Sequence, residues 1–124
     1  MKNKRMNLKE QFATITQYFS PKIIGEVNDI YVKIVKVKGQ DVPWHTHDGE
    51  DELFYVLQGR LTMQMKGETD FDLNEGELYI VPKGVEHRVF CREECRLLLI
   101  ENKTTAHTGD VESSITKTVD EQKY

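Results

Sequence analysis

Three of the four histidines and one glutamate fall into a two-part pattern of candidate metal ligands. Gly76, which opens the second part, comes seventeen positions after Gly59, which closes the first. Imidazole nitrogens and a carboxylate oxygen are donors that divalent transition metals bind in proteins, and such a set needs no thiolate. The parts are Gly39-x5-His45-x-His47-x4-Glu52-x6-Gly59 and Gly76-x5-Pro82-x-Gly84-x2-His87.

The alternation of side chains along β-strands supports a metal site without reference to any family. In a strand over 42–47, His45 and His47 share one face. Glu52, in a strand over 52–58, shares its face with apolar residues, and so does His87 in a strand over 85–91. A single inward histidine is more often an ordinary core residue. Four polar groups converging on an apolar interior cost several kcal/mol each to bury unless a ligand such as a cation satisfies them. This argument does not distinguish Glu52 from Glu50.

Both segments resemble the two signature motifs of the cupin superfamily, over about residues 39–91. One departure is Cys91, which stands where the family usually has Asn. The resemblance implies a small single-domain cupin with an all-β fold, a double-stranded β-helix or jelly-roll barrel, and it favours Glu52 over Glu50 as the carboxylate ligand. It therefore implies a metal site of His45, His47, Glu52 and His87, with Fe, Mn, Ni, Zn or Cu as the candidate ions.

The elements needed to position these residues can be predicted from the hydrophobic periodicity. Asn7 is typical of a helix N-cap, and Leu8, Phe12, Ile15 and Phe19 form the apolar face of a short amphipathic helix that ends before Pro21. The period then becomes two, which predicts strands. They are expected over 29–38, 42–47, 52–58, 60–66, 69–73, 77–81, 85–91 and 95–101. Within the strand over 29–38 the apolar residues change from even-numbered to odd-numbered positions. A bulge near Ile34 and Val35 is therefore predicted, because it would keep the apolar residues on one face.

Length and charge narrow the function classes. A chain of 124 residues suits one globular domain, divided here into an N-terminal amphipathic helix over 1–20, the barrel over 21–104 and a polar C-terminal tail over 105–124. The net charge of −4 and the scattered Lys and Arg residues favour neither nucleic acid nor an anionic membrane as a partner. We expect a cytoplasmic protein without a signal peptide, with reduced thiols at Cys91 and Cys95 and an ordinary surface histidine at His107.

The cupin resemblance implies two catalytic hypotheses, and the lining of the barrel helps to separate them from each other and from a third. Leu61, Met63 and Met65 should face inward, and with the predicted bulge Lys33, Lys36 and Lys38 should face outward. An apolar interior with an open metal favours a metal-dependent oxygenase, or dioxygenase, of a small organic molecule. A sugar-phosphate isomerase would need cationic or N–H groups for the phosphate, and it gains support if a lysine points inward. The third hypothesis is a non-catalytic module that binds a metal or small ligand.

The strand over 52–58 also predicts a homodimer. Its outer face carries Leu53, Tyr55 and Leu57, although a barrel strand should have one face in water. The N-terminal helix is one candidate cover. The cupin resemblance favours a second subunit, and two-fold pairing is the usual symmetry of soluble homo-oligomers.

Overall fold

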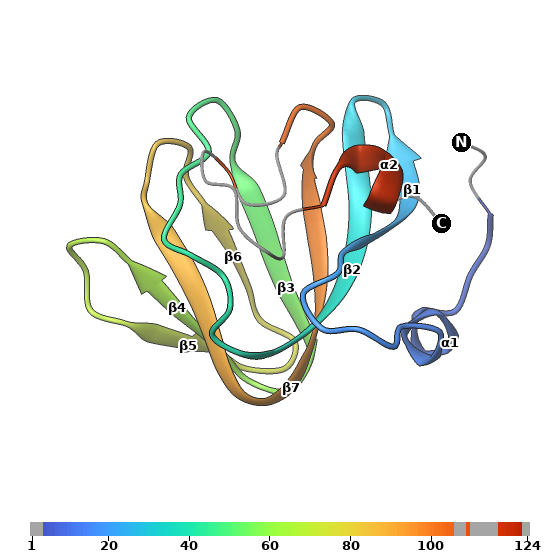
Figure 1. The fold of residues 1–124 in the computed structure, drawn as a ribbon, viewed down its shortest axis with the longest axis horizontal. Coiled ribbons are helices and arrows are strands. Elements are labelled where there is room, and N and C mark those ends of the chain that lie inside the picture. The colour runs from blue at the N-terminus through green and yellow to red at the C-terminus, as the bar shows by residue number, and fades with distance from the viewer. Residues whose placement is uncertain (1–3, 106–108, 110–116, 123–124) are drawn as a thin grey trace.

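The chain folds into two antiparallel sheets that share one long strand. A computed structural model describes residues 4–105, 109 and 117–122. Within this part of the chain no helix is long and apolar enough to cross a membrane. The elements, shown in Figure 1, are α1 (Leu8–Ala13), β1 (Lys22–Val27), β2 (Ile30–Gly39), β3 (Glu52–Gln58), β4 (Leu61–Met65), β5 (Phe71–Leu73), β6 (Leu78–Val81), β7 (His87–Asn102) and α2 (Val119–Gln122).

Strand β7 joins the two sheets. Its first residues, from His87 to Phe90, pair with β4, which also pairs with β5. Its last residues, from Cys95 to Asn102, pair with β2 and extend the larger sheet, whose order is β1-β2-β7-β3-β6. Figure 1 shows β7 descending beside β4 and β5, turning at the lower edge of the fold and rising between β3 and β2. This arrangement confirms the predicted all-β jelly-roll barrel with a short N-terminal helix.

The core of the barrel consists of the inward-facing residues of both sheets. On β4, Leu61, Met63 and Met65 are buried, as predicted, and they alternate with residues that are only partly buried. Cys91 and Cys95 are free and buried in the same core. A second apolar cluster covers the outer face of the larger sheet, where Phe12 of α1 packs with Ile24 and Ile34.

The predicted bulge near Ile34 and Val35 is wrong. β2 pairs with β7 without interruption from Ile30 to Val37, and the irregularity falls later, between Val37 and Gly39. The change in apolar parity has a different cause: β2 lies inside the sheet, and Phe12 covers the outer side of Ile34, so both faces of the strand are buried. Lys33 consequently points into the barrel and is only 1% exposed, contrary to the prediction that it faces outward.

The N-terminal helix is shorter than predicted. Asn7 caps it, because its side chain accepts a hydrogen bond from the backbone N–H of Glu10 at 3.0 Å, but the helix ends at Ala13. Phe19 therefore lies in the connection to β1 and packs in the barrel core, not on the helix. Strand β1 was not predicted. The strands expected over 85–91 and 95–101 are one continuous strand, and that over 42–47 is reduced to a single bridge at His45.

Candidate metal centre

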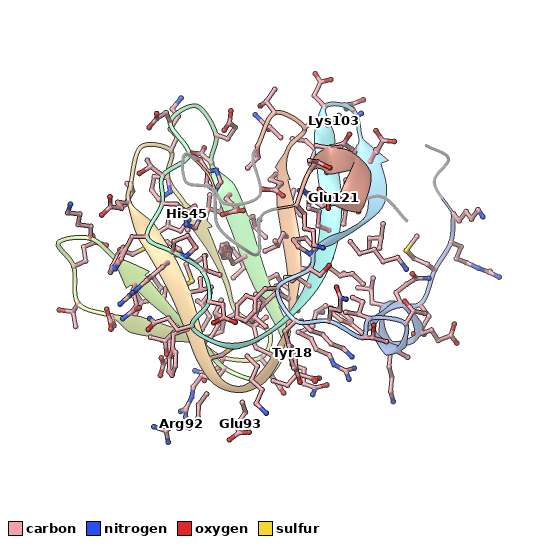
Figure 2. The ribbon with its side chains drawn as sticks, in the orientation of Figure 1. Tyr18, His45, Arg92, Glu93, Lys103 and Glu121 are labelled. Atoms are coloured by element: carbon pink, nitrogen blue, oxygen red, sulfur yellow. The ribbon has the colours of Figure 1, made fainter. Side chains whose placement is uncertain are left out.

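The four predicted ligands come from three parts of the barrel. His45 and His47 belong to the segment between β2 and β3, Glu52 begins β3 and His87 begins β7. Reciprocal backbone hydrogen bonds of 3.0 and 2.9 Å join His45 to His87, so these two residues form an antiparallel bridge. In Figure 2, His45 lies beside the first half of β7. The alternation expected from the sequence persists, because His45 and His47 are buried while Trp44 and Thr46 are less so.

The structure brings the candidate donor atoms together. One donor atom from each of the four residues lies within 4.8 Å of all the others, and all four residues are buried. The Glu52 Oε1 atom is 3.4 Å from His47 Nε2 and 3.6 Å from His87 Nε2. His87 Nε2 is buried without a hydrogen-bond partner. A buried ring nitrogen in that condition is unfavourable in an apolar core and is suited to a metal ion.

The backbone fixes the orientation of two imidazole rings. His45 Nδ1 lies 2.8 Å from the Pro43 carbonyl oxygen, and His87 Nδ1 lies 2.9 Å from that of Val85. A carbonyl only accepts, so each Nδ1 must carry the proton and each neutral ring has its lone pair on Nε2. This is the tautomer in which a histidine ligates a metal through Nε2 while its other nitrogen is held by a hydrogen bond.

The electrostatics of the cluster also suit a cation. Burial lowers the pKa of His45, and the neighbouring His87 lowers it further, so the neutral form that binds metal is favoured. Burial raises the pKa of the Glu52 carboxyl, but the polar interactions with the neighbouring imidazoles of His47 and His87 outweigh this effect and hold that pKa well below its usual range. The site thus combines a His45 ring whose neutral form is favoured with an ionised Glu52 carboxylate.

A buried polar chain next to Glu52 was missed by the sequence analysis. Glu101 lies opposite Glu52 in the β3–β7 register, and its Oε1 is 2.6 Å from the Nζ of Lys33. Lys33 also donates a hydrogen bond to the side-chain oxygen of Gln122 on α2. Burial, followed by the charge of Glu52, raises the pKa of the Glu101 carboxyl well above its ordinary value. The only sequence signal for this buried polar group was that, without a bulge in β2, Lys33 shares a face with Val35 and Val37.

Gly109 is a further residue that packs on the site. Its φ of +61° is in the left-handed region, and a Cβ there would lie 2.4 Å from the Thr46 carbonyl oxygen and 2.9 Å from the His45 ring. Both facts require glycine at this position. A predicted polar tail gave no reason to expect a contact with His45.

The remaining candidate residues are Glu50 and His107. Glu50, which strand parity had allowed, accepts a hydrogen bond from Thr104 at 3.1 Å and is not part of the four-residue group. His107, which was predicted to be an ordinary surface histidine, lies outside the described residues. Of the two acidic residues that parity admitted, the structure therefore places Glu52 with the histidines.

Comparison with known proteins supports the fold. The family model for the cupin domain matches residues 32–101. A cupin-2 domain containing protein from Shewanella frigidimarina NCIMB 400 is 39% identical, with a TM-score of 0.75, covering 78% of this chain and 93% of that one. Protein NMB1881 from Neisseria meningitidis is 32% identical, with a TM-score of 0.73, and the coverage is 80% of this chain and 99% of that one.

A curated relative is also similar. The uncharacterized protein YdbB from Bacillus subtilis (strain 168) is 35% identical over 80 residues, which are 64% of this chain and 70% of that protein.

Proposed function

The chain belongs to the cupin domain family, and from that premise we propose that it binds a divalent transition metal and transforms a small organic molecule beside it. His45, His47, Glu52 and His87 would hold the ion. The observation that carries the proposal is the convergence of four buried donors within 4.8 Å. Bound there, a divalent ion would supply Lewis acidity and open coordination positions.

The surroundings favour an oxygenase of a small organic substrate over a sugar-phosphate isomerase. A cavity next to the cluster is lined by His45, Glu52 and otherwise apolar side chains. Lys33 does point into the barrel, which was the condition under which the isomerase gained support. However, its ammonium is bound by Glu101 and Gln122, and it does not line this cavity. A phosphate would need an available cation or a group of N–H donors.

The chain's own residues would have three tasks in such a reaction. The carbonyls of Pro43 and Val85 orient the rings of His45 and His87, so that both present Nε2 to the centre. The negative charge of Glu52 attracts the cation. The apolar lining excludes water from the substrate and strengthens electrostatic interactions there.

The function is tested by anaerobic purification, elemental analysis and oxygen uptake with a panel of small organic molecules. Oxygen consumption by the wild type that is lost in His87→Ala would support the oxygenase. Conversion between aldose and ketose forms of a phosphorylated sugar would contradict it. Tight binding of a panel molecule with no turnover would instead indicate the binding module.

We further propose that the functional unit is a homodimer formed through the outer face of the larger sheet. Leu78 and Ile80 of β6 are 53% and 49% exposed, and they pair with Tyr55 and Leu53 of β3. Helix α1 covers the neighbouring part of this face, where Leu57 packs against the second apolar cluster, to which α1 contributes. The helix therefore leaves an apolar patch on β6 that a second copy would bury.

A further inference from the structure

The cavity next to the candidate metal ligands is small and lined mainly by apolar side chains. Its volume is about 60 Å³, which is space for only a few atoms. His45 and Glu52 are the polar residues of its lining, so a molecule inside contacts the candidate metal centre on one side and hydrocarbon elsewhere. Phe19 lines the cavity and is 4% exposed.

Phe19 has an unusual backbone conformation. Its φ is +56°, in the left-handed region, which is unfavourable for a bulky residue. Asn28 is the other non-glycine residue of the described chain with a positive φ, and asparagine tolerates this region well. An aromatic residue retained in such a conformation needs a compensating interaction, and strained residues occur often at ligand sites.

The loop that carries Phe19 is held at three points. The Phe19 backbone N–H donates to the Lys36 carbonyl at 2.8 Å, and the Lys36 ammonium donates to the Ile15 carbonyl at 2.9 Å. The Tyr18 hydroxyl donates to Glu94 at 3.0 Å. Tyr18 is 45% exposed and Phe19 is buried, so the constrained backbone directs successive aromatic rings to opposite sides. Figure 2 shows Tyr18 near the lower edge of the fold, well away from His45.

We propose that Phe19 limits the size of the molecule that the metal site accepts, and that this molecule is small, neutral and largely apolar. The proposal rests on the proposed function, because it assigns a ligand class to the same site. Phe19 fills space that a larger ligand would need beside His45 and Glu52. The cavity lining provides no cationic side chain for an anionic ligand.

The test uses metal-free protein, with benzene as the probe, and follows the His45 ring protons by NMR. Phe19→Gly removes a phenyl ring, and glycine accepts the positive φ without strain. The space created should therefore hold benzene, as engineered apolar cavities do. Phe12→Ala is the matched control, because Phe12 is equally buried but belongs to the cluster on the outer face of the sheet.

We expect Phe19→Gly to bind benzene at least about 10-fold more tightly than the wild type, with ring-current shifts at His45. Phe12→Ala should bind without those shifts. Equal binding by the wild type, or binding to Phe19→Gly that leaves His45 unshifted, would overturn the size limit. Benzoate that binds Phe19→Gly more tightly than benzene would overturn the neutral ligand class.

Two further measurements keep the proposal falsifiable. If Phe19→Gly is too unstable, Phe19→Leu should show the same changes in smaller degree, and unchanged benzene binding would then refute the proposal. Metal content should be equal in the wild type and Phe19→Gly, because Phe19 supplies no donor atom. A wild type that binds no metal would refute the proposed function and leave the benzene result interpretable.

Discussion

Replacing Lys33 with methionine should severely destabilise the metal-free protein. Lys33 and Glu101 are 1% and 4% exposed, and their charged atoms are 2.6 Å apart. Removing Lys33 leaves the buried Glu101 carboxyl, whose pKa burial and Glu52 already raise, without its ionic and hydrogen-bonding partner, at a cost of about 3–5 kcal/mol. For a domain of this size that corresponds to a fall in melting temperature of at least about 10 °C.

The assay is urea unfolding at pH 7 for Lys33→Met, Glu101→Leu and the double variant. The double variant should recover much of the loss, since an apolar pair of similar volume replaces the buried charges. Lys66→Met is the control: Lys66 forms a 3.4 Å pair with Glu86 but its side chain is 72% exposed, so the change should have little effect. A Lys33→Met variant within about 1 kcal/mol of the wild type, or additive losses in the double variant, would refute this reasoning.

Three other predictions concern protonation, assembly and the tail. In an NMR titration of the metal-free protein, His45 should titrate below about pH 6.5, because burial lowers its pKa. The stability that neutral His45 contributes is then present above its unfolded-state pKa and is lost as pH falls through its folded-state pKa. A titration midpoint of His45 above 6.5 would contradict this account. Light scattering at micromolar concentration should give twice 14.5 kDa for the wild type and a monomer for Ile80→Glu, whereas a wild-type monomer would exclude the dimer. Gly109→Ala should shift the His45 resonances, because its Cβ would meet the Thr46 carbonyl at 2.4 Å; an unchanged spectrum would disprove the contact.

The residues that converge on the site could be predicted because strand alternation and motif spacing are local properties. His45, His47, Glu52 and His87 each lie on the inward face of a short apolar segment, and the glycine turns set the order of the strands. Parity could not separate Glu52 from Glu50. The resemblance to a known motif was needed for that choice.

The errors arise where tertiary contacts decide. A bulge in β2 was predicted on the assumption that one face is wet, but α1 covers that face and Lys33 finds Glu101, 68 positions away in the sequence. The apolar spacing of Phe19 fits a helix, although its side chain fills the barrel from a loop. Long-range pairing of this kind leaves at most a weak signal in a single local segment, as at Lys33 in β2.

The central claim is tested most directly by the metal content of two matched variants after identical anaerobic purification. Glu52→Gln and Glu50→Gln each remove one carboxylate, two positions apart, but only Glu52 lies in the buried cluster. We predict that Glu52→Gln lowers metal affinity by about 10-fold or more, judged from the effects of disturbing a metal site, while Glu50→Gln keeps the wild-type content. Equal metal content in both variants and the wild type would contradict the assignment of His45, His47, Glu52 and His87 as the metal centre.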